Sequence, residues 1–144
     1  MPELIPFKAE HAFTMVPREY YEERIEDLVR KEQDPFSFTI VEGGYILGCA
    51  GIGRMWDGVG QAWAFFSDDI AGHAFWLHRN TRLLMRQAIQ RLGLHRVECV
   101  AACENFRNQR WLEGLGFWRE HNIPVRKYTP DKKDAFRYEW VEAD

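Results

Sequence analysis

One asparagine lies where an apolar stretch gives way to a short amphipathic one, and recognition of a ligand is the chemistry that this position favours. Asn105 comes two residues after the apolar run VECVAAC and opens the segment NFRNQRWLEGLGF. Open α/β sheets usually bind ligands where a strand is followed by a helix. An asparagine there can cap the helix or bond a ligand through its amide, and the two roles are compatible. We therefore expect a ligand site at Asn105.

Three arginines share one side of a second predicted helix. Arg79 and Arg82 are three residues apart and Arg86 follows four later, so a helix places them on one face. Residues 73–119 carry eight arginines and three acids, a net charge of +5, whereas residues 1–72 carry six basic and thirteen acidic residues, a net charge of −7. This division favours a local anionic ligand on the later half and argues against general coating of nucleic acid. A solvated arginine face is the alternative.

Length and composition indicate one domain. With 144 residues, 46% of them hydrophobic, the chain suffices for a single core, and we expect one domain over residues 1–144. No run approaches the roughly 20 apolar residues that span a bilayer, and the N-terminus lacks the pattern of a signal peptide. We expect a protein of the cytoplasm with no membrane partner.

The three cysteines, Cys49, Cys99 and Cys103, lie in apolar runs. Their number is odd, and their spacing matches neither a zinc ribbon nor a disulfide framework. This pattern predicts buried thiols in a reducing compartment. No metal site is expected.

The elements that would position these groups follow from apolar spacing. Residues 17–32 open with a proline and carry apolar residues at helical spacing, which predicts a helix. Two β-rich runs within 36–56 are separated by Gly43-Gly44, a dipeptide that predicts a tight hairpin. A further run within 60–69 predicts a central strand.

The second half alternates between the two patterns. Residues 75–92 carry an apolar stripe and stop at Gly93, which predicts the longest helix. Residues 95–103 are almost continuously apolar, as in a strand covered on both faces. A helix is predicted over 105–115, and two strands with one wetted face over 117–125 and 136–143. A turn at 128–134 joins these strands.

The chain resembles the GNAT N-acetyltransferases, whose late strand ends in Asn and is followed by a helix and a closing Gly-Phe. Asn105, Gly116 and Phe117 occupy those positions, and Asn108, three residues after Asn105, stands where the family usually has Ala or another small residue. The resemblance implies an α/β (α+β) fold with a single mixed, mostly antiparallel sheet flanked by helices. Within the family, the chain is similar to short GNAT-like proteins of tailed phages and prophages, which share the helix RNTRLL and a tail like YTPDKKDAFRYEW.

The resemblance also implies acetyl-coenzyme A (acetyl-CoA), whose pyrophosphate main-chain N–H groups can hold at a helix start. The family's loop has Arg or Gln, two residues, Gly, one residue, and Gly or Ala. Residues 69–74, DIAGHA, are the nearest match, with the acid Asp69 at the first position. An acid repels phosphate, and Arg79 could compensate. Phe66 would flank the acyl arm, with core packing as the alternative. The residues assigned to acetyl-CoA are Phe66, Ser67, Ile70, Gly72, His73, Ala74, Arg79 and Asn105.

Acetyl transfer needs a base for the ammonium and an acid for the leaving thiolate. The resemblance makes Glu104, at the strand end, the best-placed base, with Asp68 and Asp69 as competitors. The usual acid is a tyrosine four residues before the glycine of Gly-Phe. Leu112 stands there, and a hydrocarbon donates no proton.

The leading hypothesis is acetyl transfer to an unidentified small-molecule or peptide amine, with a homodimer left open. This hypothesis requires an opening between two strands, the one ending near Phe66 and the one ending near Cys103, so that the two are not hydrogen-bonded to each other up to their ends. The first alternative is a catalytically inactive GNAT-like phage or prophage protein with a structural or host-interaction role. The second is nucleic-acid binding by a surface of four arginines, Arg79, Arg82, Arg86 and Arg96.

Overall fold

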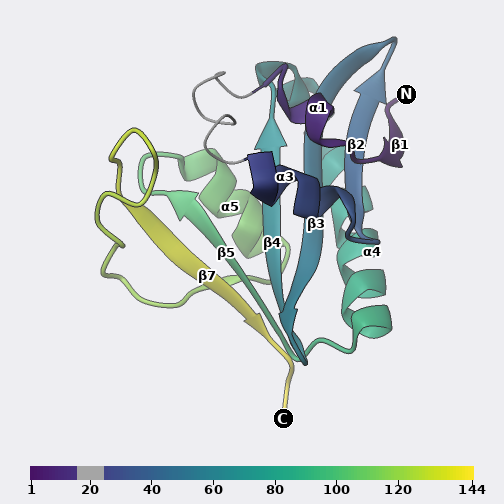
Figure 1. The fold of residues 1–144 in the computed structure, drawn as a ribbon. Coiled ribbons are helices and arrows are strands. Elements are labelled where there is room, and N and C mark those ends of the chain that lie inside the picture. Colours follow the sequence, from purple (N-terminus) through teal and green to yellow (C-terminus); the bar gives the residue numbers. More distant parts are fainter. Residues whose placement is uncertain (16–24) are drawn as a thin grey trace. The chain divides into compact units, whose positions relative to one another are not determined.

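The structure, a computed structural model, describes residues 1–15 and 25–144 (Figure 1). The chain divides into two compact units: unit 1 comprises residues 1–53 and 62–80, and unit 2 comprises residues 54–61 and 81–144. The elements in chain order are β1 (Glu3–Pro6), α1 (Ala9–Ala12), α3 (Ile25–Glu32), β2 (Ser37–Glu42), β3 (Tyr45–Trp56), β4 (Val59–Phe66), a 3₁₀ helix (Asp68–His73), α4 (Ala74–Leu92), β5 (Arg96–Ala102), α5 (Phe106–Gly114), β6 (Trp118–Arg119) and β7 (Ala135–Val141).

Seven strands form one mixed sheet in the order β1-β2-β3-β4-β5-β7-β6. The pairs β1–β2, β2–β3, β5–β7 and β6–β7 are antiparallel, and the pair β4–β5 is parallel. The parallel ladder joins Val59–Gln61 to Arg96–Glu98 and comprises three residue pairs. The predicted fold class, a mixed and mostly antiparallel sheet with helices, is confirmed.

Glycines end two elements where the sequence predicted. Gly43 and Gly44 have φ angles of 56° and 81° between β2 and β3, which is the left-handed pair that a two-residue hairpin turn requires. Gly93, with φ of 63°, follows α4 directly. Only glycine adopts this conformation without strain, so both boundaries follow from local chemistry.

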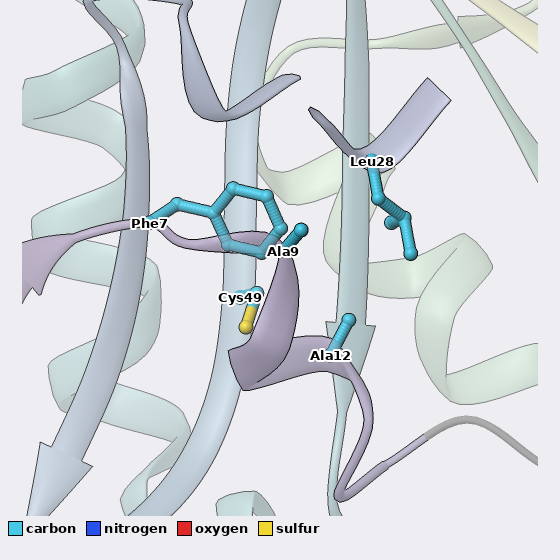
Figure 2. Packing of buried hydrophobic residues seen from close by; sticks show 5 residues of the cluster. All are labelled: Phe7, Ala9, Ala12, Leu28 and Cys49. Carbon is cyan, nitrogen blue, oxygen red and sulfur yellow. The ribbon is translucent and has the colours of Figure 1, made fainter. Parts of the chain in front are cut away.

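The core of unit 1 lies beside β3, where α1 and α3 pack (Figure 1). Trp63 and Phe65 of β4 pack against this core, and the ring centroids of Trp63 and Phe7 are 4.9 Å apart in an edge-to-face arrangement. Aromatic pairs in this geometry add to the stabilisation from buried area. Figure 2 shows the five buried side chains of the cluster: Phe7, Ala9, Ala12, Leu28 and Cys49.

Within unit 2, β5 buries one face rather than two. Val97, Cys99 and Ala101 are buried, whereas Val100 between them is 37% exposed. The prediction of a strand covered on both faces was therefore wrong, because valine, cysteine and alanine mask the alternation that burial reveals. On the more open face Arg96 pairs with three carboxylates, those of Glu98, Glu120 and Glu139.

Two further differences concern short elements. The predicted strand at 117–125 is reduced to β6 (Trp118–Arg119) and an isolated bridge from Val125 to Ala135. Pro124 has no N–H for a ladder, which explains the interruption. Helix α1 was not predicted, since four residues are too few to show helical spacing. Of the helix predicted at 17–32, residues 17–24 lie outside the described residues and the remainder is α3.

No helix within residues 1–15 and 25–144 has both the length and the apolarity that crossing a bilayer requires.

Candidate functional site

β4 is longer than its pairing with β5. The ladder ends at Gln61, and β4 continues for five more residues, Ala62–Phe66, while β5 continues beyond Glu98 to Ala102. The β4–β5 ladder thus ends before the last residue of either strand, and an opening for acetyl-CoA beyond it stays a prediction. The main-chain groups of Ala62–Phe66 lie outside this ladder.

The segment after β4 places main-chain donors at a helix start. Ser67 precedes the 3₁₀ helix; its N–H donates to the carbonyl of Leu47 at 3.0 Å and its carbonyl accepts from Ile70 at 3.2 Å. The hydroxyl oxygen of Ser67 is buried and has no hydrogen-bond partner among the described residues. The first N–H groups of a helix lack partners inside it, so the N–H groups of Asp68 and Asp69 are the donors that the start of this 3₁₀ helix can offer to a ligand.

The same segment leaves space beside its main chain at Gly72. A Cβ built there would meet no atom within 4 Å, so the folded chain itself does not demand a glycine. An absent side chain does let a ligand approach the backbone. Ala74 is also small and exposed, whereas Ile70 is buried and anchors the turn.

Two acids accompany these donors. Asp68 and Asp69 are both exposed in the 3₁₀ helix. Because they are exposed, water and salt screen their charge. The remaining negative charge still opposes the binding of an anion nearby. The orphaned hydroxyl of Ser67 and the open backbone at Gly72 therefore fit a pyrophosphate held through the main chain, with the two carboxylates lowering its affinity.

The side chain of His73 is engaged elsewhere. Its Nε2 atom lies 2.8 Å from a carboxylate oxygen of Glu42, on β2. The imidazole is thus held by a carboxylate of the same unit. No spacing rule connects the end of β2 with the start of α4, so the sequence carried no signal for this pair.

Arg79 is exposed on the first half of α4, and Arg82 and Arg86 are exposed further along the helix. In the described part of the chain, none of the three has an ion-pair partner. Arg96 differs, because its guanidinium is about three-quarters buried among carboxylates. The fourth arginine of the nucleic-acid hypothesis is therefore neutralised and does not belong to an open basic surface.

Phe66 packs against β3. A Cβ built on Gly48 would lie 2.5 Å from the ring of Phe66, so the ring lies directly over that glycine. This contact agrees with core packing, the alternative role that the sequence suggested for Phe66. A role for Phe66 beside an acyl arm stays a prediction.

In unit 2, Asn105 caps α5. Its Oδ1 atom accepts a hydrogen bond from the N–H of Asn108 at 3.0 Å, which confirms the capping role. The side chain is exposed, and its Nδ2 group donates to no residue in the part of the chain that the structure describes. One end of the amide therefore holds the helix and the other end is free to bond a ligand.

Glu104 carries a partner that was not predicted. Its carboxylate accepts a hydrogen bond from the Nζ atom of Lys133 in the turn before β7, and the two side chains are 63% and 48% exposed. The hydrogen bond that Lys133 donates to Glu104 raises the pKa of the Lys133 ammonium. The best-placed candidate base thus already binds an alkylammonium ion.

A buried glutamine ties the end of β5 to α5. The Nε2 group of Gln109 donates to the carbonyls of Ala102 and Cys103 at 2.9 and 3.0 Å, and its Oε1 atom accepts from Arg119 at 3.0 Å. Gln109 is 5% exposed. A polar residue on the apolar side of a predicted helix was the signal that could have identified it, because buried amides are almost always satisfied.

Neither Leu112 nor Tyr138 provides an acid at the site. Leu112 is buried on α5, so the position of the family's usual tyrosine is part of the core. Tyr138 is fully buried on β7, and its hydroxyl accepts from Arg119 at 3.4 Å.

A surface cavity of about 590 Å³ in unit 2 is lined by Glu113, Phe117, Trp118, Arg119 and Asn122. None of the residues predicted to bind acetyl-CoA lines it.

No family model matches the chain, and no curated protein does. Solved structures match along almost its whole length. A GNAT-family acetyltransferase from Bacillus anthracis is 15% identical with a TM-score of 0.70, covering 99% of this chain and 96% of its own. The chain has the GNAT fold.

Two more GNAT-fold structures have named activities. A ribosomal-protein-S5-alanine acetyltransferase from Vibrio fischeri is 18% identical with a TM-score of 0.71, covering 99% of this chain and 94% of its own. A variant of a spermidine N-acetyltransferase from Vibrio cholerae is 15% identical with a TM-score of 0.70, covering 97% and 93%. At these identities, the likeness shows the fold alone.

Proposed function

We propose that this chain is an acetyl-CoA-dependent N-acetyltransferase acting on an amine. The observation that carries the proposal is the short β4–β5 ladder of three pairs, followed by a 3₁₀ helix with open space beside the main chain at Gly72. The GNAT fold supports it, and the acceptors named for two similar structures, alanine and spermidine, are amines.

The residues that would hold acetyl-CoA lie in two groups. In unit 1, the main chain of Ser67–Ala74, with the hydroxyl of Ser67, would bind the pyrophosphate, and Arg79 would add positive charge from the exposed side of α4. In unit 2, the Nδ2 group of Asn105 would donate to an amide carbonyl of the carrier arm. When bound, acetyl-CoA supplies a thioester carbonyl that an amine can attack.

Glu104 would act as the base that takes a proton from the acceptor ammonium. Its carboxylate is exposed at the end of β5 and already accepts a hydrogen bond from an alkylammonium group. The lack of a tyrosine at Leu112 does not prevent transfer, because a thiol is acidic enough to depart as the thiolate without being protonated first. Solvent would then reprotonate the sulfur.

A colorimetric assay of thiol release tests this proposal. Full-length protein incubated with acetyl-CoA and a panel of primary amines should release coenzyme A faster with at least one amine than without any, and Glu104→Gln should slow that release about 100-fold or more. Equal release by wild type and Glu104→Gln with every amine would remove Glu104 from the mechanism.

The second candidate is a catalytically inactive GNAT-like phage or prophage protein with a structural or host-interaction role. The buried Leu112 and the exposed Asp68 and Asp69 favour it, because all three depart from what acetyl transfer uses. Binding separates the candidates. Saturating acetyl-CoA at 100 times its Kd should add about 2.7 kcal/mol to the free energy of unfolding, whereas a decayed site gives no shift in the melting temperature.

We also propose that residues 1–144 act as one domain in the cytoplasm. The three cysteines are free thiols, which agrees with a reducing compartment. A homodimer stays a prediction.

A further inference from the structure

The turn before β7 holds one lysine against the candidate base. Thr129 organises this turn: its hydroxyl accepts from the N–H of Lys133 at 2.9 Å, and its N–H donates to the carbonyl of Lys133 at 3.1 Å. The next residue, Asp134, accepts from the N–H of Cys103 at 3.0 Å. The backbone on both sides of the Glu104–Lys133 pair is therefore fixed, and all of these residues lie in unit 2.

The other four lysines, all described by the structure, differ from Lys133. Lys8, Lys127 and Lys132 are exposed and have no ion-pair partner among the described residues. Lys31 is 8% exposed and pairs with Asp27. Lys133 alone among the described lysines combines an accessible ammonium with the carboxylate assigned as base.

We propose that Lys133 is a site of acetylation by the chain's own activity. This inference rests on the proposed function. The Nζ ammonium of Lys133 donates to the carboxylate of Glu104, which is the contact that an acceptor ammonium would make with the proposed base.

The reaction balances with acetyl-CoA as the co-reactant. Glu104 takes one proton from the ammonium, and the freed lone pair attacks the thioester carbonyl carbon. The C–N bond forms, the C–S bond breaks, the nitrogen loses its second proton to solvent, and solvent protonates the departed thiolate. The products are the Nζ-acetyl amide, coenzyme A as the thiol and one proton released from Glu104 to solvent.

Without catalysis, Lys133 should be acetylated more slowly than an unpaired lysine, not faster. The hydrogen bond that Lys133 donates to Glu104 raises the pKa of Lys133, so its free amine, the form that attacks acetyl-CoA, is disfavoured. Without catalysis, Lys133 should react with acetyl-CoA more slowly than its neighbour Lys132. Faster acetylation at Lys133 therefore reports action of the base rather than exposure.

The test is mass spectrometry of the folded full-length protein after brief incubation with deuterated acetyl-CoA. We expect the initial rate at Lys133 to exceed that at Lys132 at least tenfold, and the ratio to fall to about one or below in urea. Glu104→Gln should abolish the preference, whereas Glu113→Gln, which removes another exposed acid, should retain it. Each rate should be independent of protein concentration if the transfer is intramolecular.

Equal rates at Lys132 and Lys133 in the folded protein would overturn the inference, as would an unchanged preference in Glu104→Gln. A parallel assay with a free alkylamine distinguishes failure of the self-acetylation from failure of the proposed function. Turnover of that amine without labelling of Lys133 refutes the self-acetylation alone. A protein that neither binds acetyl-CoA nor acetylates any amine refutes the proposed function, and the inference with it.

Discussion

Substitutions at Asn105 can separate the two roles of its amide. The Oδ1 atom accepts from the N–H of Asn108 and caps α5, while Nδ2 has no partner in the described chain. Alanine removes both functions. Serine keeps a cap of comparable strength but lacks the amide N–H.

The expected magnitudes follow from this division. Asn105→Ala should cost about 1 kcal/mol of stability, which lowers the melting temperature by about 3 °C for a domain of this size. Asn105→Ser should melt within about 1 °C of the wild type, because the cap remains. Both variants should bind coenzyme A about threefold to tenfold more weakly, since one hydrogen bond contributes about 0.5–1.5 kcal/mol.

Thermal melting and titration calorimetry with coenzyme A measure the two effects independently. If Asn105→Ala melts like the wild type, the cap contributes nothing and the first half of the reasoning is wrong. If Asn105→Ser binds coenzyme A as tightly as the wild type, Nδ2 contacts no ligand.

Three other predictions test the structure at separate points. Gly72→Val should change the melting temperature little, since a Cβ meets no atom within 4 Å, yet weaken coenzyme A binding more than tenfold by calorimetry. Gln109→Leu leaves the carbonyls at the end of β5 and a donor of Arg119 unsatisfied, so chemical denaturation should show a loss of about 1–3 kcal/mol. Burial raises the pKa of Cys49 to about 11 and of Cys99 to about 12; above about pH 9 the unfolded chain therefore loses thiol protons that the native chain keeps, and the free energy of unfolding falls as pH rises. Cys49→Ala should reduce that slope in urea titrations, and an unchanged slope would contradict the assignment.

Local chemistry made part of this fold predictable. Gly43-Gly44 and Gly93 end elements through backbone conformations that the residue type itself favours, and Asn105 caps the helix that follows it. Each of these signals acts over a few residues, so the sequence alone displays it.

The side-chain contacts around the candidate site, such as the one between Glu104 and Lys133, were not predictable in this way. Lys133 reaches Glu104 because β5 and β7 pair, with Ala102 opposite Ala135. Likewise His73 meets Glu42 through the packing of unit 1. Such pairs depend on tertiary arrangement, whereas spacing rules describe a single helix or strand.

The central claim is that acetyl-CoA binds to the main chain beyond the end of the β4–β5 ladder. Backbone amide NMR during titration of the full-length protein with coenzyme A measures this directly. The largest changes in amide chemical shift should fall on Ala62–Phe66 and Ser67–Ala74, and these changes should saturate as coenzyme A is added. Saturating shifts confined to the cavity lined by Glu113 and Trp118, or no shifts at millimolar coenzyme A, would contradict the claim.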